Sequence, residues 1–535
     1  MVENEQDRTK YRLAGYSALI ERYDLEVIPN PHKSLVTASG IQRIDSRGGI
    51  IEEVYPSKYW PGDTLGDHLE FALKYDGTNP AILAGLFQKA AKEDLLEYIR
   101  SKPTGKYARR VWFLYEFLTG TMLPLADLKR GNYIDLLEPD EYYTITPGRQ
   151  VRRQRVNDNL LGDRRFCPMI RRTDTLRDFE TADLPNRCRQ VVVGYSPELL
   201  KRALGYLYTK ETKSSFEIEH LKPTSTRTGR FVALLQMAEQ EDFCRTTELI
   251  EVQNRIVDAR FRDPGYRRSQ NYVGEAVAWQ NEKIHFAGPK PEDLADLMEG
   301  LMAAHARLDT GSVSAVVHAA AIAYGFVFLH PFEDGNGRIQ RFLIHNILAR
   351  RGFTPDGLMF PISASMLKNP AAYDASLEAF SRQLMPLVEY SLDEDGRMTV
   401  HNDTARWYRY MDLTPQTEAL FRFIDQTIDT ELAGELAFLA NYDTTKKAIQ
   451  EIVDMPDRQI DLFIRFCLQN NGRLSARKRA GHFDALSDEE IARLEQAVQF
   501  AYGDTDQMNH RQGQSDGDGR QSLGSAFIGG PEDDH

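Results

Sequence analysis

The chain has 535 residues of ordinary globular composition, with 41% apolar, 10% aromatic and 27% charged residues. This composition excludes collagen-like, mucin-like and largely disordered proteins, and the length predicts about three domains. Asp and Glu outnumber Lys and Arg by 79 to 66, which gives a formal net charge of −13 and argues against DNA as the main partner.

Cysteine usage and the apolar runs indicate a cytoplasmic protein. The four cysteines lie far apart without a C-x-x-C pair, so they predict neither a disulfide framework nor a zinc finger and fit a reducing compartment. The first residues, Met-Val-Glu-Asn-Glu-Gln-Asp, are charged where a signal peptide needs apolar side chains. The longest apolar run, Ala315 to Leu329, is shorter than the roughly 20 residues of a membrane span. We expect a buried helix there and no membrane partner.

The N-terminal part, residues 1–196, mixes strand and helix signals. Residues 41–54 hold two short apolar runs around a Gly-Gly pair, which predicts a hairpin, and residues 80–119 show helical spacing. Between Arg149 and Arg172, eight arginines stand against two acids. That cluster predicts either a patch for a phosphate-rich or acidic partner or an internally paired surface, and the net charge favours the second. We expect an α+β region.

Helical periodicity dominates residues 197–395, which we expect to form the central domain. Apolar side chains recur at helical spacing from Pro197 to Tyr208, from Thr228 to Ala259 and again after Pro291. The exception is Gln270 to Phe286, which has an extended pattern between two Pro-Gly breaks. This region predicts a helical bundle with one short β segment.

The C-terminal part divides into a helical module and a tail. A polar break precedes residues 396–502, whose apolar side chains again follow helical spacing. Residues 503–535 hold seven glycines and almost no apolar side chains, so burial cannot offset the entropy of ordering them. We expect a disordered tail after a separate helical module.

The segment richest in chemistry is His330-Pro-Phe-Glu-Asp-Gly-Asn-Gly-Arg-Ile-Gln-Arg341, which joins the buried helix to an amphipathic one. Residues 334–337 can bend sharply and turn their backbone N–H groups inward. Such a nest at a helix N-terminus binds phosphate. A Gly-x-Gly pair alone is more often a turn than a phosphate site, so the charged neighbours decide the interpretation.

Those neighbours supply the other parts of a phosphate site. Arg338 and Arg341 lie in the first helical turn, where cations oppose the helix macrodipole unless an anion is bound between them. Asp334 can hold Mg²⁺ beside the phosphates, and His330 can take a proton from an attacking hydroxyl. The plain alternative, a capped interhelical loop with a satisfied histidine, leaves this clustering of charges unexplained.

This segment resembles the motif of the Fic family, His-Pro-Phe-x-Asp/Glu-Gly-Asn-Gly-Arg-x-x-Arg, and every specified position is present. The resemblance extends over roughly residues 197–392. It implies a mainly α chain, with a Fic-type helical bundle core and a β-hairpin flap between the N-terminal α+β region and the C-terminal helical module. Most Fic enzymes transfer AMP from ATP to a Ser, Thr or Tyr hydroxyl of a protein. Doc-type phosphotransferases carry Lys in the glycine-rich loop, whereas this chain has Gly337.

The resemblance also implies a role for each motif residue. His330 is the general base, Phe332 anchors the loop in the core, and Asp334 holds Mg²⁺. The phosphates of ATP are bound by the loop and the two arginines, the second of them chiefly at the γ-phosphate: Gly335, Asn336, Gly337, Arg338 and Arg341.

Residues 214–220 are similar to the Fic inhibitory motif Ser/Thr-x-x-x-Glu-Gly/Asn, matching at Ser215 and Glu219. In that family the glutamate reaches the second motif arginine and competes with the γ-phosphate. His220 stands where the family has Gly or Asn, so the turn is expected to differ. Glu217 is the alternative brake if the register shifts, and an ordinary helix start is the plain alternative.

Two further elements match the family more loosely. Gln270 to Phe286 occupies the place of the flap, a hairpin that orients the target by strand pairing and therefore does not name it. Tyr373 fits an element whose aromatics wall the adenine, whereas Asp374 departs from it. Tyr373 therefore either contacts the base or only packs in the core.

The sequence leaves three functions open. The first is a protein adenylyltransferase that uses Mg-ATP, is restrained by Glu219, and modifies a target protein or itself. The second is removal of AMP, for which some Fic proteins use the inhibitory glutamate to activate water. The third is a partner-binding regulatory protein with a silent Fic site, against which the intact motif argues.

Overall fold

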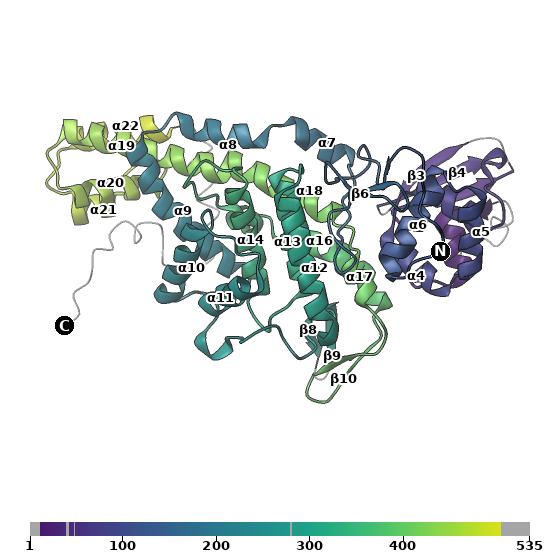
Figure 1. Cartoon of the computed structure of the whole chain (residues 1–535). Helices are drawn as coiled ribbons and strands as arrows, with labels where there is room; N and C mark the ends of the chain where they lie inside the picture. Colours follow the sequence, from purple (N-terminus) through teal and green to yellow (C-terminus); the bar gives the residue numbers. More distant parts are fainter. Residues whose placement is uncertain (1–10, 39–41, 48, 279–280, 504–535) are drawn as a thin grey trace. The chain divides into compact units, whose positions relative to one another are not determined.

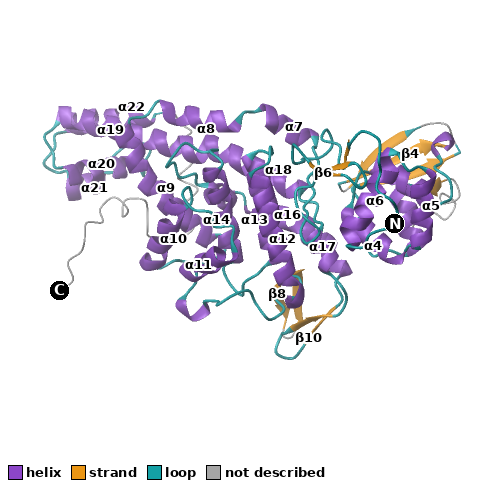
Figure 2. Ribbon diagram, viewed as in Figure 1, coloured by secondary structure: helices purple, strands orange, loops and turns teal. Residues whose placement is uncertain are grey.

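The computed structural model describes residues 11–38, 42–47, 49–278 and 281–503, and the chain is mainly helical over them. The tail predicted at 503–535 lies, from residue 504 on, outside the described residues. The mainly α fold class predicted from the sequence is confirmed (Figures 1 and 2). None of the helices in the described ranges has the length and apolar character needed to cross a membrane.

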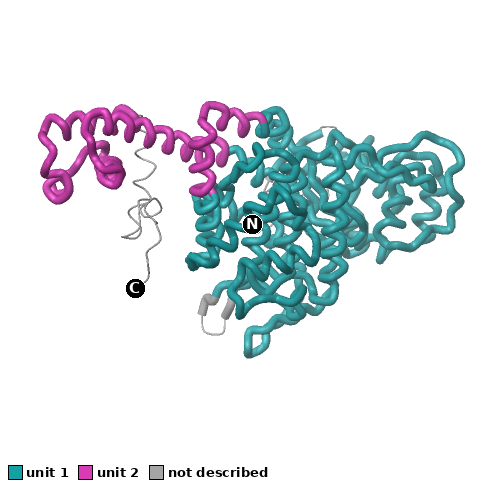
Figure 3. Tube along the Cα trace, turned by 60° about the vertical axis from the view of Figure 1, so that its left-hand side comes forward, with its two compact units in different colours: residues 1–185, 208–425 teal, residues 186–207, 426–535 magenta. Residues whose placement is uncertain are grey.

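Contacts divide the chain into two units (Figure 3). Unit 1 comprises residues 1–185 and 208–425, and unit 2 comprises residues 186–207 and 426–535. The four segments predicted from the sequence therefore stay a prediction. Three helices contain residues of both units: α8 (Leu184–Val193), α9 (Pro197–Glu217) and α18 (Thr414–Gln426).

The N-terminal part of unit 1 is α+β, as predicted. A four-stranded sheet has the order β1-β2-β4-β3, formed by β1 (Tyr11–Leu13), β2 (His32–Thr37), β3 (Arg43–Arg47) and β4 (Ile50–Pro56). β3 and β4 are the predicted hairpin, and β2 pairs with β4 in parallel. The accompanying helices are α2 (Gly15–Tyr23), η1 (Ser57–Tyr59), α3 (Leu65–Phe71), η2 (Ala72–Asp76), α4 (Pro80–Lys89), α5 (Lys92–Ser101) and α6 (Lys106–Thr119).

The arginine-rich stretch folds into a small sheet of order β5-β7-β6, from β5 (Ile134–Asp135), β6 (Arg149–Val151) and β7 (Val156–Asp158), followed by α7 (Asp174–Thr181). Its charges are largely paired within the chain. Arg153 bonds Glu116 at 3.0 Å, and Arg165, Arg171 and Arg172 also meet carboxylates. This pairing favours the internally paired surface over a patch for an acidic partner.

The central helices of unit 1 surround α13 (Ala315–Leu329), in which every residue from Val316 to Leu329 is buried. The predicted buried helix is thereby confirmed. α13 contacts α12 (Pro291–Asp309) and α14 (Asn336–Arg350). The remaining helices are α10 (Ser225–Met237), α11 (Thr246–Ile256), η3 (Ala259–Phe261), α15 (Ile362–Lys368), α16 (Pro370–Leu384), η4 (Met385–Leu387) and α17 (Ala405–Arg409).

Two hairpins accompany these helices (Figure 2). The predicted flap is an antiparallel pair, β8 (Tyr272–Ala278) and β9 (Asn281–Ala287). The second hairpin pairs β10 (Tyr390–Leu392) with β11 (Met398–Val400). The Tyr272 hydroxyl donates to the carbonyl oxygen of Gly396 at 2.9 Å, which ties the base of the flap to the second hairpin.

Unit 2 is helical, as the sequence predicts for the C-terminal module. Its further elements are η5 (Thr427–Leu432), α19 (Ala433–Ile452), α20 (Asp457–Leu468), α21 (Ala476–His482) and α22 (Asp488–Tyr502). The apolar faces of α19, α20 and α22 meet in one core that contains Ile449, Phe463 and Leu494.

Candidate active site

The loop between α13 and α14 is shaped by two residues with positive φ. α13 ends at His330 (φ +48°), and α14 begins after Gly335 (φ +92°). The Asn336 side chain closes the loop, because its Oδ1 accepts from the Phe332 N–H at 3.0 Å and its Nδ2 donates to the Phe332 carbonyl at 2.7 Å. Phe332 is fully buried and thus anchors the loop in the core, as predicted.

The His330 imidazole is held in the tautomer that a general base needs. Its Nδ1 lies 3.2 Å from the carbonyl oxygen of Val327, which only accepts, so Nδ1 carries the hydrogen and Nε2 keeps a free lone pair. Burial, reinforced by the positive charge of Arg267, lowers the pKa of His330 to about 4. The imidazole is therefore neutral at pH 7 and ready to accept a proton.

Arg338 and Arg341 are both fully buried, and one carboxylate forms ion pairs with the two. Glu219 Oε2 lies 2.8 Å from Arg338 Nε, and Glu219 Oε1 lies 2.8 Å from Arg341 Nη2. Glu217 is exposed, so the register predicted with Glu219 holds and the shifted alternative does not. Asp334 makes a second ion pair with Arg338, at 2.6 Å.

The buried Arg341 has two further partners. Ser215 accepts from it through both its hydroxyl (2.9 Å, from Nε) and its carbonyl oxygen (2.6 Å, from Nη2). The Tyr373 hydroxyl accepts from Nη1 at 3.3 Å and donates to Gln340 at 2.8 Å. Tyr373 is 5% exposed, and burial raises its pKa. These contacts favour the second interpretation of Tyr373, which packs in the core and orients Arg341.

Gly337 lets the carboxylate approach α14 closely. A Cβ at this position would lie 2.7 Å from Glu219 Oε1 and 3.2 Å from Arg341 Nη1. Contacts under 3.0 Å require something to move, so a side chain here is incompatible with the observed position of Glu219. The glycine therefore serves the inhibitory contact as well as the phosphate loop.

The turn that presents Glu219 closes the end of α9 with a histidine at its left-handed position. The N–H of Leu221 bonds the carbonyl of Phe216, and the N–H of His220 bonds the carbonyl of Glu217, which together form a Schellman motif. His220 has φ +55°, the conformation that Gly or Asn adopts at this position. The expectation that this turn departs from the family's stays a prediction, and His220 carries backbone strain in this conformation.

Comparison with known proteins agrees with this geometry. Residues 243–348 match the family model described as "Fic/DOC family". The chain carries a Fic domain.

Curated relatives share the same region. The chain is 31% identical over 121 residues to "Protein adenylyltransferase Fic" of Aedes aegypti, which is 22% of either protein. It is 32% identical over 124 residues to the protein of that name in Culex quinquefasciatus, again 22% of either. For Drosophila virilis the values are 38% over 90 residues, 17% of this chain and 16% of the relative. The chain thus spans about a fifth of the length of these relatives.

Solved structures of Fic proteins are also similar to the chain. A Fic family protein from Desulfovibrio desulfuricans G20 matches with a TM-score of 0.36 and 15% identity, covering 63% of this chain and 90% of that one. A Fic domain containing signaling protein from Bacteroides thetaiotaomicron VPI-5482 matches with a TM-score of 0.33 and 22% identity, covering 48% and 96%.

The Fic loop is bound to the base of the flap by a residue that sequence analysis missed. Arg267 donates to the carbonyl oxygens of His330 (2.8 Å), Ser269 (2.7 Å) and Pro289 (2.6 Å). On the flap itself, the Phe286 ring lies 6.2 Å from the imidazole, centroid to centroid. Nothing in the local sequence marks Arg267, because its acceptors are backbone atoms and two of them, in His330 and Pro289, belong to other segments.

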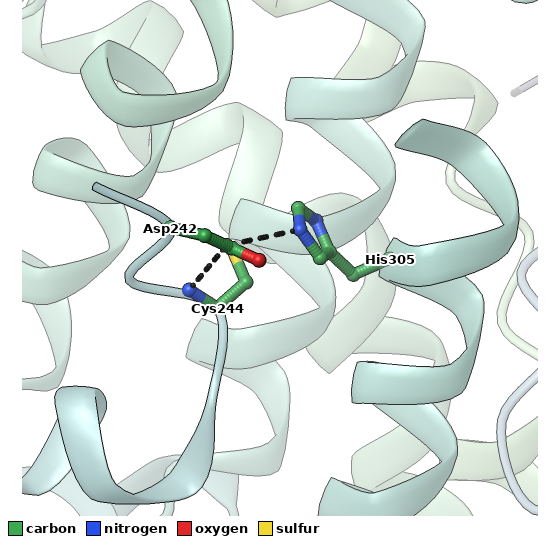
Figure 4. Close-up of side chains that lie close together, drawn as sticks. All are labelled: Asp242, Cys244 and His305. Atoms are coloured by element: carbon green, nitrogen blue, oxygen red, sulfur yellow. Dashed lines mark hydrogen bonds and ion pairs between the residues drawn. The ribbon is translucent and has the colours of Figure 1, made fainter. Parts of the chain in front are cut away.

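A second cluster, away from the Fic loop, has the composition of a metal site. Ligand atoms of Asp242, Cys244 and His305 lie within 4.8 Å of one another (Figure 4). Arg351 donates to His318 Nδ1 at 3.0 Å, and burial lowers the pKa of His318 to about 2, so this neutral ring carries its hydrogen on Nε2. That hydrogen points at His305 Nδ1, 3.0 Å away.

The direction of these hydrogen bonds determines whether the cluster can bind a metal ion. His305 accepts at Nδ1 and must therefore carry its own hydrogen on Nε2, which lies 3.2 Å from Asp242 Oδ1. A metal ion would need the lone pair of that nitrogen. The cluster is thus a chain of polar contacts between helices, in which His305 Nε2 meets Asp242 at ion-pair distance without a hydrogen bond among the described residues, and we assign no metal to it.

The strain at His220 gives a stability prediction. His220→Gly should stabilise the protein by about 0.5–1 kcal/mol, because glycine adopts positive φ without steric cost, although it raises the entropy of the unfolded chain. Chemical denaturation measures the change. Glu217→Gly, at an exposed helical position in the last turn of α9, just before the left-handed residue, is the control and should destabilise by about 1 kcal/mol. A destabilised His220→Gly protein would contradict the left-handed turn.

Proposed function

We propose that this Fic domain transfers AMP from Mg-ATP to a Ser, Thr or Tyr hydroxyl of a target protein, and that Glu219 restrains it. The observation that carries the proposal is the combination of a neutral imidazole, with Nε2 free, and two buried arginines on one anion-binding loop. The name "Protein adenylyltransferase Fic" borne by relatives supports the reaction class. Gly337 in place of lysine favours nucleotidyl over phosphoryl transfer.

In the proposed reaction the target hydroxyl oxygen forms a bond to the α-phosphorus of ATP. His330 Nε2 takes the hydroxyl proton, and the bond to the bridging oxygen of the β-phosphate breaks, so pyrophosphate leaves. Arg338 and Arg341 hold the outer phosphates, and the loop N–H groups of residues 335–337 neutralise charge on the inner ones. The products are the AMP-modified side chain and pyrophosphate.

The residues present fit a magnesium nucleotide. The Asp334 side chain is 45% exposed beside the loop, as a carboxylate that shares Mg²⁺ with phosphates must be. Arg338 Nη1 is buried and has no hydrogen-bond partner among the described residues, so it is a donor that a phosphate oxygen satisfies. The bound Mg²⁺ supplies neutralisation of the phosphate charge.

The brake follows from what Glu219 occupies. Its two oxygens bond the same guanidinium groups that the outer phosphates need, so ATP binds in the productive orientation only after Glu219 leaves. A charge-assisted hydrogen bond contributes roughly 1.5–3 kcal/mol. This corresponds to a competent population reduced by roughly tenfold to a hundredfold.

The proposed partner is a protein segment that pairs with the flap. β8 belongs to a two-stranded sheet, in which its neighbour among the described residues is β9. Addition of a strand to such a sheet needs only backbone groups of the partner. Self-modification uses the same chemistry. The four cysteines are free and buried, which fits the cytoplasmic setting that we propose.

The first prediction about function tests whether Glu219 inhibits the transfer of AMP. Glu219→Gly should raise transfer of labelled AMP, to the protein itself or to lysate proteins, by about tenfold to a hundredfold, because it frees both arginines. Arg341→Ala should lower transfer even in the Glu219→Gly background. If Glu219→Gly instead abolishes removal of preformed AMP, the domain is a deAMPylating enzyme. If no variant transfers or removes AMP, the silent-site alternative is correct.

The second prediction tests the base. His330→Ala in the Glu219→Gly background should lower the rate of transfer by roughly 10²–10⁴-fold, the usual contribution of a general base. ATP binding, followed by calorimetry, should be nearly unchanged because the imidazole acts on the attacking hydroxyl. Transfer at the unmodified rate would remove His330 from the mechanism.

The third prediction tests the phosphate contacts. In the same background, Asp334→Ala should weaken Mg²⁺-dependent ATP binding, and Arg338→Ala should weaken ADP and ATP binding alike. AMP binding should change little in either variant, since it lacks the outer phosphates. Calorimetric titrations that show equal losses for AMP and ATP would contradict the assignment of both residues.

A further inference from the structure

Polar side chains connect α9 and its last turn to α14 at three levels. The spacing is four residues on α9, and three and four on α14, so each set lies on one helix face. Residue numbers rise along α9 while those of their partners fall along α14. The pairs are Glu211–His345, Ser215–Arg341 and Glu219–Arg338. The second and third levels belong to the inhibitory contact described above. The first level, Glu211–His345, is not part of the inhibitory contact and does not directly contact the loop of residues 334–337.

The first level is a buried carboxylate that accepts three hydrogen bonds from two residues. Glu211 is fully buried, and its Oε1 accepts from His345 Nε2 at 2.7 Å and from the Ser363 hydroxyl. Its Oε2 accepts from the Ser363 N–H at 2.9 Å, in the first turn of α15. One side chain of α9 therefore holds both α14, which carries the Fic motif, and the segment that leads to Tyr373.

The two ends of this connection differ in how strongly they are held. A buried carboxylate is costly unless it keeps its hydrogen bonds, so displacing α9 at Glu211 would leave three polar groups unpaired. Glu219, in contrast, is 25% exposed and lies in the strained turn that ends at His220. The last turn of α9 is therefore the part that can move while the helix stays in place.

We propose that Glu211 is a positioning residue for the brake: its contacts with His345 and Ser363 fix the register of α9 on α14, so that Glu219 reaches both arginines. Release then occurs by unwinding of residues 216–221 and does not require α9 to leave. This inference rests on the proposed restraint by Glu219. It adds a site of regulation outside the nucleotide contacts.

A purely structural role for Glu211 makes the opposite prediction. Loss of a buried hydrogen bond would then weaken the whole core, and activity would fall whether or not Glu219 is present. A positioning role acts only through Glu219. The effect of changing Glu211 must therefore disappear once Glu219 has been removed, and this dependence separates the two roles.

The experiment is a double-mutant cycle on the full chain, measured as self-labelling with labelled ATP and Mg²⁺. Glu211→Gln keeps the shape but replaces one acceptor oxygen by a donor, which opposes the N–H of Ser363. We expect it to raise labelling roughly threefold to tenfold, less than Glu219→Gly does, because it loosens the position of the Glu219 carboxylate without removing it. In the Glu219→Gly background it should change labelling by less than about twofold.

Two variants keep the test decisive. Ser363→Ala removes one hydroxyl donor and preserves the backbone contact, so it should activate more weakly than Glu211→Gln and serves if that variant does not fold. Thr212→Val is the matched control, because Thr212 is buried on α9 but bonds only Tyr208 of its own helix. It should not activate. Hydrogen exchange in Glu211→Gln should be faster at the amides of 218–221 and unchanged in α13.

The outcomes separate this inference from the proposed function. If Glu219→Gly activates but neither Glu211→Gln nor Ser363→Ala does, the positioning role is wrong and the brake stands. If Glu211→Gln lowers labelling equally in both backgrounds, Glu211 is only structural. If Glu219→Gly itself fails to activate, the restraint by Glu219 is wrong, and the positioning role falls with it.

Discussion

The site depends on the burial of two guanidinium groups that cannot be left without anionic partners. Arg338 and Arg341 are fully buried on successive turns of α14, and an uncompensated buried charge costs several kcal/mol. The position of Arg338 in the first turn of the helix, where the macrodipole is positive, adds to that cost. The fold must therefore supply anions there, and in the described state these are Glu219 and Asp334. A triphosphate supplies the same charge in another form, so in the proposed function the two arginines that Glu219 and Asp334 neutralise at rest also receive the nucleotide.

The proposed exchange of Glu219 for a triphosphate depends on the backbone at three positions. Gly337 leaves room for Glu219 Oε1, which a Cβ would meet at 2.7 Å. His330 and His220 both take positive φ, one at the end of α13 and one at the end of α9. A non-glycine residue in this conformation costs about 1–2 kcal/mol, and here it directs the base and the inhibitory turn toward the same loop.

Sequence analysis found the parts of the site that are contiguous in the chain. The Fic loop, the buried helix before it and the register of Ser215 and Glu219 follow from spacing and motif, because one or two helical turns determine their geometry. The groups it missed join distant segments. Arg267 bonds three backbone carbonyls, and Glu211 bonds residues more than 130 positions away, and no local pattern marks either. The left-handed conformation of His220 was likewise not evident from its residue type, since a histidine at positive φ is uncommon.

Charge balance determines how the resting site changes into the reactive one. The two arginines and the two carboxylates, Asp334 and Glu219, sum to zero when all are ionised. Mg-ATP brings a net negative charge, so both carboxylates cannot keep their present contacts when it binds. Asp334 can turn from Arg338 to Mg²⁺, because its side chain is nearly half exposed, and its charge is then used within the nucleotide complex. Glu219 has no metal to turn to, and it must leave. In the proposed function, this asymmetry assigns Asp334 the role of Mg²⁺ ligand and Glu219 that of brake.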